Sequence, residues 1–256
     1  MKLAAHVFVH FISLTIAPFA WGEDVISSLQ NSVGIRGATA ITANEVTGSG
    51  FNAKQPDTMM LNYGLNVKNK PTGSWVFIIF DYNVTSGQQK VATGLTPSEV
   101  SVQRQEYALT LLSEPFFSTA WGQVQASIGY KMVDYSVDET TPNVALTNLN
   151  TRGPTGSLKL KNDFANQTDS LEADLEIYFP HHIRESDVTT GSNPSALGAE
   201  VQLKFNHKIT PRWQLSLGLN YQYETIQFEG TGSRGTVNAT DVRTQFTIPI
   251  ELEYLF

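Results

Sequence analysis

Long stretches of the chain alternate between apolar and polar residues, and the clearest runs from Trp213 to Tyr223. Its odd-numbered positions are apolar or aromatic, whereas its even-numbered positions carry Gln, Ser, Gly and Asn. Successive side chains of a β-strand point to opposite faces, so such a segment has one apolar and one polar face. Comparable patterns predict about ten strands in all, at 32–44, 59–68, 74–85, 100–112, 122–132, 155–164, 171–179, 197–206, 213–223 and 238–256.

The connections between these strands alternate between short and long. The short ones, at 69–73, 114–116, 163–168 and 208–211, hold the Pro, Gly, Asn or Asp that turns need. The long ones, at 45–57, 86–99, 136–154, 180–195 and 229–237, are polar. Outer-membrane barrels have short periplasmic turns and longer outer loops. The pattern therefore predicts an all-β fold, an antiparallel up-and-down transmembrane β-barrel with both termini on the side of the short turns.

A secreted β-sandwich is the alternative, because its strands also have one buried face. The alternation here persists over about ten residues per strand, as a tilted membrane crossing needs, whereas sandwich strands are usually about five or six. The apolar face carries almost no charge, and aromatic residues gather near the strand ends, as in interfacial girdles. They are Phe205, Trp213, Tyr254 and Phe256 on the turn side and Tyr82, Tyr130, Phe179, Tyr221 and Tyr223 on the loop side.

The first residues predict export. Lys2, an apolar stretch and a small-x-small end at Ala20 and Gly22 form the pattern of a signal peptide over residues 1–22, which leaves 23–256 as one barrel domain. An N-terminal anchor is the alternative, but the apolar run is short and Pro18 interrupts it. The chain has no cysteine, which excludes a lipoprotein and disulfides. A net charge of −7 argues against nucleic acid as a partner.

The end of the chain resembles the terminal strand of bacterial outer-membrane β-barrel proteins. Phe246, Ile248, Ile250, Leu252, Tyr254 and Phe256 alternate there with mostly polar residues. The resemblance implies that the barrel assembly machinery reads this strand and that the protein resides in the outer membrane, in contact with its lipid. Pro249 departs from the pattern, since proline cannot donate to a strand ladder, and predicts a bulge or a local break.

The polar face carries charges of nearly balanced sign that are predicted to line the lumen. With Lys68, they are Arg36, Asp81, Arg104, Glu106, Lys131, Lys159, Lys161, Glu172, Asp174, Glu176, Glu200, Lys204, Glu224, Arg243, Glu251 and Glu253. Lys159 and Lys161 are predicted to pair across strands with the acids at 172–176, and Arg36 with Glu251 or Glu253. The interior is then either a salt-bridged network that fills a narrow barrel or a constricted polar pore.

Three histidines follow the predicted signal peptide, at His181, His182 and His207. The segment 181–187 combines imidazole, carboxylate and hydroxyl groups, which can perform acid–base or nucleophilic chemistry or bind a metal. Its spacing matches no metal motif, and an ordinary polar loop is the favoured interpretation. Ten-stranded outer-membrane proteases resemble the chain in strand number only. No cofactor-binding motif is present in the sequence.

Three functions remain open at this level. The first is a narrow porin-like or transport-related barrel, because the predicted lumen is polar. The second is a structural or surface-interaction barrel with a closed, salt-bridged lumen, because the loops are long and polar. The third is a hydrolase at the outer rim, built on His181 and His182. The sequence predicts neither the solute nor the oligomeric state.

Overall fold

The structure is a computed structural model that describes residues 31–256 apart from 50, 94–95, 138–147, 187–188 and 234. The predicted signal peptide, residues 1–22, lies outside the described residues. The described strands are β1 (Ser32–Gly48), β2 (Phe51–Asn69), β3 (Val76–Thr93), β4 (Thr96–Ser113), β5 (Phe117–Thr119), β6 (Gly122–Val137), β7 (Asn148–Asp163), β8 (Asp169–Tyr178), β9 (His182–Ser186), β10 (Ser192–Thr210), β11 (Trp213–Glu229) and β12 (Thr240–Leu255).

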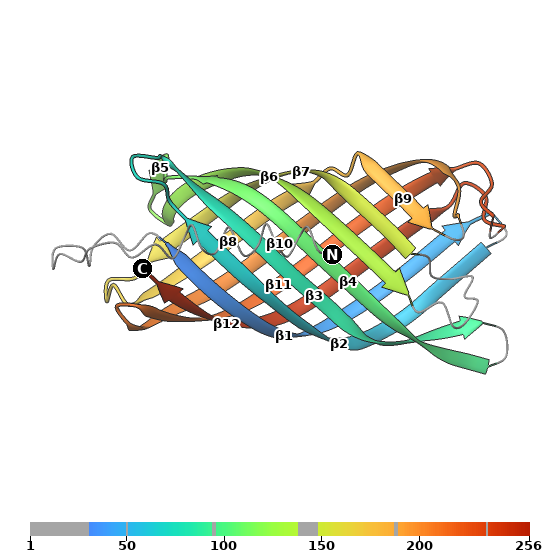
Figure 1. Cartoon of the computed structure of the whole chain (residues 1–256), viewed down its shortest axis with the longest axis horizontal. Helices are drawn as coiled ribbons and strands as arrows, with labels where there is room; N and C mark the ends of the chain where they lie inside the picture. The colour runs from blue at the N-terminus through green and yellow to red at the C-terminus, as the bar shows by residue number, and fades with distance from the viewer. Residues whose placement is uncertain (1–30, 50, 94–95, 138–147, 187–188, 234) are drawn as a thin grey trace.

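These strands form one closed antiparallel barrel (Figure 1). Neighbours in the chain pair with each other, β1 pairs with β12, and the pairing of β6 with β7 joins the ends of the sheet. The short β5 belongs to the turn before β6, and β9 continues the line of β8 after a break at 179–181. The barrel wall therefore has ten strands, which confirms the predicted fold and strand number.

The barrel has a turn end, with the short connections and Phe256, and a loop end opposite (Figure 1). Phe256 accepts a hydrogen bond from the Asn31 amide at 3.2 Å and donates one to the Asn31 carbonyl at 2.9 Å. The last residue thus closes the barrel against the start of β1, as the sequence predicts. No described segment forms a helix with the length and apolarity that a membrane span requires.

The side-chain burial is that of a membrane barrel, because the apolar side chains point outward. On β11, Leu217 is 52% exposed while Ser216 and Asn220 are buried. Apolar side chains point outward on β12 as well, where Ile248 and Ile250 are exposed. A water-soluble sheet would bury these side chains, whereas lipid solvates them, so the exposed apolar band is the surface that faces the bilayer.

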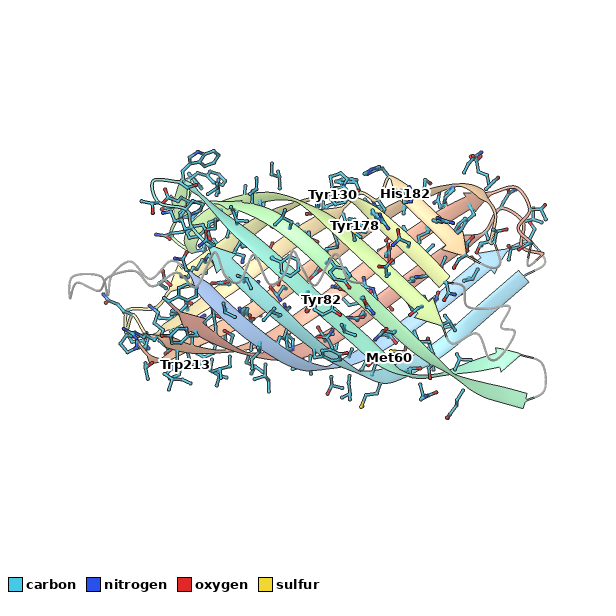
Figure 2. All side chains as sticks on the ribbon, viewed as in Figure 1. Met60, Tyr82, Tyr130, Tyr178, His182 and Trp213 are labelled. Carbon is cyan, nitrogen blue, oxygen red and sulfur yellow. The ribbon has the colours of Figure 1, made fainter. Side chains whose placement is uncertain are left out.

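The aromatic residues cluster as predicted at the turn end, where the ring centroids of Trp213 and Tyr254 are 5.0 Å apart and those of Tyr254 and Phe256 are 6.2 Å apart. Figure 2 shows Trp213 near that end and Tyr130 about halfway along the barrel. Trp75 and Trp121 are further exposed aromatics at the turn end. Amphipathic rings at the edges of an apolar band favour the polar boundaries of a bilayer.

The predicted loops were too long. Strand β1 ends only at Gly48 and β2 begins at Phe51, so most of the predicted loop 45–57 belongs to a β-hairpin. The predicted loop 86–99 likewise belongs mostly to β3 and β4. Their polar composition suggested loops, but backbone hydrogen bonds continue the ladder beyond the apolar band. At the turn end, β10 reaches Thr210, which shortens the turn predicted at 208–211.

Pro249 interrupts pairing without changing the register. In the ladder between β11 and β12, the pair Leu217↔Ile250 is followed directly by Asn220↔Thr247. Two residues of each strand are therefore left unpaired, and the register is the same before and after them. The predicted local break is confirmed, and a bulge is not formed. Gly218 faces the proline, and a Cβ at this position would lie 3.0 Å from Pro249 Cγ. The missing side chain leaves room for the ring.

Candidate functional site

The turn half of the lumen contains a cavity of about 480 Å³, here called the vestibule. Its lining begins at the turn end with Asn31, Pro115 and Pro211 and reaches Lys131 in the middle of the barrel. Fourteen of the charged residues predicted to face the lumen line it: Arg36, Lys68, Asp81, Glu106, Lys131, Lys159, Lys161, Glu172, Asp174, Glu176, Glu200, Lys204, Glu251 and Glu253.

Ion pairs join neighbouring strands along the vestibule wall. Lys159 Nζ on β7 lies 3.6 Å from Glu172 and 3.7 Å from Asp174 on β8, where the register places these residues side by side. Lys204 on β10 lies 2.8 Å from Glu251 on β12, across β11. Both lysines lie beside acids, so their charges are compensated within this wall.

The expected pairing of Arg36 is wrong. Arg36 and Glu251 face each other in the register of β1 and β12, but the Arg36 guanidinium lies 3.1 Å from Asp81 on β3. Glu251 pairs with Lys204 instead, and Glu253 accepts a hydrogen bond from Gln214 at 3.0 Å. Lys161 pairs with Asp163 on its own strand at 3.2 Å rather than with the acids of β8. Long side chains inside a barrel reach across it, so adjacency in the sheet does not fix their partners.

A central ion cluster closes the inner end of the vestibule. Lys131 lies 3.2 Å from Glu200 and 4.0 Å from Glu106 and also pairs with Glu176. Arg104 lies 3.1 Å from Glu106. These residues come from β4, β6, β8 and β10. Their side chains meet in the middle of the barrel because the polar faces of all its strands point inward.

Gln222 on β11 ties the central ion cluster together. Its amide nitrogen donates to Glu200 at 2.9 Å and to Glu106 at 3.4 Å, and its oxygen accepts from Arg104 at 2.5 Å. Asn220 donates to Glu200 at 2.8 Å. Charges with several hydrogen-bond partners of this kind form a fixed network, and such networks are costly to disrupt one member at a time.

A smaller cavity of about 60 Å³ lies beyond the cluster. Arg104, Glu224 and Arg243 line it, as does Tyr178, which is labelled in Figure 2. Arg243 lies 2.8 Å from Asp241, and its guanidinium carbon is 4.4 Å from the centre of the Tyr135 ring. The lumen thus narrows sharply between its turn half and its loop half.

The loop half of the barrel contains a hydrophobic core inside the strands. Its buried members, here called the loop-end core, are Ala40, Met60, Val100, Val102, Tyr135, Leu149, Ile226 and Phe228. These residues occupy the inward-facing positions of the same strands that carry polar groups nearer the turn end. On β11, for example, the inward-facing residues change from Gln222 and Glu224 to Ile226 and Phe228. These side chains, together with buried polar ones such as Gln89 and Thr151, occupy the barrel interior at its loop end.

The loop-end core was not predicted from the sequence, where the interior was expected to be polar throughout. The alternation of inward-facing and outward-facing positions along each strand already indicated these residues. Val100 and Val102 share the parity of Arg104 and Glu106, so they face inward with them. Ala40, Met60, Val100 and Val102 lie within predicted strands whose inner face was taken to be polar, whereas Leu149 lies in the predicted loop 136–154.

The histidines of the loop end are not assembled with acids. Alternation in β9 leaves His182 and Arg184 exposed and turns Glu185 to the other face, where it accepts hydrogen bonds from Thr190. The His181 ring contacts the Tyr130 ring at 5.9 Å, and Asp187 lies outside the described residues. Within the described part of the chain, no group of three metal-binding side chains occurs. At the turn end, His207 Nδ1 lies 2.6 Å from Asp169.

No protein-family model matches the chain, and no curated protein matches its sequence. Among solved structures, the outer membrane protease OmpT of Escherichia coli is similar to 90% of this chain and 98% of its own, with a TM-score of 0.52 and 11% identity. The translocator domain of the autotransporter NalP of Neisseria meningitidis matches 100% of this chain and 98% of its own, with a TM-score of 0.49 and 13% identity. At such identities the likeness concerns the fold alone. The chain therefore has the fold of the bacterial outer-membrane β-barrels.

Proposed function

We propose that the protein is a closed outer-membrane barrel that works through the surface of its loop end rather than as an open pore. The observation that carries the proposal is the loop-end core, in which Met60, Val102, Ile226 and Phe228 are buried inside the strands. A pore that conducts ions needs a continuous polar path, whereas packed apolar side chains exclude water. The central ion cluster is a second barrier on the same axis.

The location follows from the same proposal. Short turns of outer-membrane barrels face the periplasm, so the turn end is assigned to the periplasm and the loop end to the outside. Residues 1–22 serve as the export signal, and the strand that ends in Phe256 serves as the element that the assembly machinery reads. The two hydrogen bonds between Phe256 and Asn31 support this role for the last strand, since they complete the barrel.

The order of the loop end supports a role in surface interaction. The Thr189 amide donates to Ser233 Oγ at 2.8 Å, and the Ser233 amide donates to Thr189 Oγ1 at 3.0 Å. The Ser49 amide donates to the Val237 carbonyl at 3.0 Å. These bonds link three separate connections into one surface above the core. A surface that is already ordered loses less conformational entropy when a partner binds.

A narrow transport barrel is the second candidate, and the vestibule favours it. The cavity gives a solute access to the centre of the barrel from the turn end. Passage would then require both the central ion cluster and the loop-end core to move. Recording from planar lipid bilayers separates the candidates.

The test uses folded protein whose insertion is verified by its resistance to heat-induced unfolding on gels. A closed barrel gives no steady current over a wide voltage range. Regular conductance steps from wild-type protein would contradict the proposed closed state and favour transport. A double variant, Ile226→Gly with Phe228→Gly, is expected to remain closed or to flicker, because the central ion cluster is intact. Adding Lys131→Gly to it is expected to raise the current.

A further inference from the structure

Lys68 differs in its contacts from the other cations that the sequence predicted to face the lumen; Lys208, which also lines the vestibule without an ion pair among the described residues, is exposed at the turn end. Each of the other predicted luminal cations lies within ion-pair distance of a carboxylate: Arg36, Arg104, Lys131, Lys159, Lys161, Lys204 and Arg243. No carboxylate of the described residues makes such a pair with Lys68. Its Nζ instead lies 4.2 Å from the centre of the Phe77 ring. The side chain therefore brings into the vestibule a positive charge that no direct ion pair of the described residues neutralises.

The position of Lys68 places this charge across the cavity from further lysines. Lys68 lies on β2. In the ten-strand wall, β8 is the fifth strand from β2 in either direction, so β8, which carries Glu172, lies on the opposite side of the barrel. Lys161 on β7 and Lys204 on β10 are the register partners of Glu172, and Lys159 Nζ lies 3.6 Å from its carboxylate. These lysines lie beside acids of the same wall, so Lys68 supplies the positive charge that an anion in the vestibule would contact.

The wall beside Lys68 is apolar on its β3 side, whereas most of the vestibule lining is polar or charged. Phe77 and Ile79 on β3 line the vestibule next to it, while Asn66, the neighbouring inward residue of β2, donates its amide to Asp81 at 2.8 Å. A volume of about 480 Å³ falls in the range of about 300–1,000 Å³ that small-molecule sites occupy. Such sites combine an apolar wall with a few polar groups that fix the orientation of the ligand.

We propose that the vestibule binds a small organic anion that enters from the turn end, with its carboxylate or phosphate group on Lys68 and its apolar part against Phe77 and Ile79. The ligand supplies the counter-charge that Lys68 lacks, and a charge on a partly enclosed lysine is stabilised most by a hydrogen-bonded anion. This site is independent of the closed loop end, because the vestibule ends at the central ion cluster.

Calorimetric titration of the folded full-length barrel in a nonionic detergent tests the site. The probes are benzoate and phenyl phosphate, with benzylammonium as a probe of similar shape and opposite charge. We expect both anions to bind once per barrel and benzylammonium not to bind. Lys68→Gln is expected to weaken anion binding by about tenfold or more, the size of one lost charge-assisted hydrogen bond. Lys68→Arg keeps the charge and is expected to retain most of the affinity.

Lys54→Gln is the matched control, because Lys54 carries the same charge on the exposed loop end, 3.8 Å from Glu45. It is expected to bind the anions as wild type does. Three results would overturn the proposal: no anion binding by wild-type protein at millimolar concentrations, equal binding of benzylammonium, or an affinity of the folded Lys68→Gln barrel equal to that of wild type. Heat-resistant migration on gels confirms that each variant is folded before titration.

Discussion

Strand β11 carries one arrangement of side chains between Trp213 and Tyr223 and the reverse arrangement from Thr225 to Glu229. In the first part, apolar side chains such as Leu217 face outward and polar ones face the lumen. In the second part, Ile226 and Phe228 face inward and are buried, while Gln227 is exposed. The backbone is a continuous strand in both, so the surroundings decide which face is apolar. Lipid surrounds the first part and water the second.

The comparison explains why the two halves of the lumen differ. Within the bilayer, apolar side chains lower the free energy by facing lipid, which leaves the polar groups to pair inside. Beyond the bilayer, the hydrophobic effect favours the inside of the barrel, as in a soluble protein. The loop-end core therefore follows from strands that continue past the membrane. The polar vestibule is a consequence of the membrane segment itself.

The largest effect is expected from removing the centre of the ion cluster. Lys131→Met leaves Glu176 and Glu200 close together without their shared cation, and breaking a buried network in this way costs about 3–5 kcal/mol. Urea unfolding in lipid vesicles measures the loss. Lys161→Met is the control, because Lys161 and Asp163 are 36% and 56% exposed, and such pairs contribute about 0–1 kcal/mol. Equal losses would contradict a central network that holds the barrel.

The loop-end core is tested by Ile226→Ala. Ile226 is 0% exposed, and truncation of a buried isoleucine costs about 2–5 kcal/mol through lost burial and the cavity that remains. Gln227→Ala, on the opposite face of the same strand, is expected to change the free energy of unfolding by less than about 0.5 kcal/mol. A small effect at Ile226 would mean that the loop half is not packed as a core.

The outward face offers a test of the reversal along one strand. Leu217→Lys places a charge on the lipid face and is expected to destabilise the barrel by about 2–4 kcal/mol, whereas Gln227→Lys, beyond the lipid, is expected to be neutral within about 0.5 kcal/mol. Unfolding in vesicles of one lipid compares the two directly. Similar values at both positions would place the membrane boundary elsewhere.

The smallest effect is expected at the histidines of the loop end. His182 is exposed and faces away from Glu185, so His182→Ala is expected to change the free energy of unfolding by less than about 0.5 kcal/mol. His181→Ala is also expected to have a small effect on the free energy of unfolding, although it removes the contact between the His181 and Tyr130 rings. Hydrolysis of a peptide or lipid ester by wild-type protein that is lost in both variants would restore the rim-hydrolase hypothesis.

The sequence predicted the membrane part of the fold well, because alternation over the length of a bilayer crossing leaves few other structures. Trp213–Tyr223 and the strand ending at Phe256 lie where the pattern put them. It predicted which charges face inward, since parity fixes the face. It did not predict that Arg36 pairs with Asp81, because partners across a lumen depend on the tilt and stagger of the strands. Nor did it predict the loop-end core, because the inner face of every strand was expected to stay polar along its whole length.

Access of water to the two halves of the lumen tests the closed barrel most directly. The chain has no cysteine, so single cysteines can be introduced and labelled with a charged thiol reagent in reconstituted vesicles. Gln202 lines the vestibule, Ala40 belongs to the loop-end core, and Lys54 is exposed at the loop end. The account predicts rapid labelling of Gln202→Cys from the turn end and of Lys54→Cys from the loop end, with no labelling of Ala40→Cys from either side. Rapid labelling of folded Ala40→Cys would contradict it, because the lumen would then be open to water along its whole length.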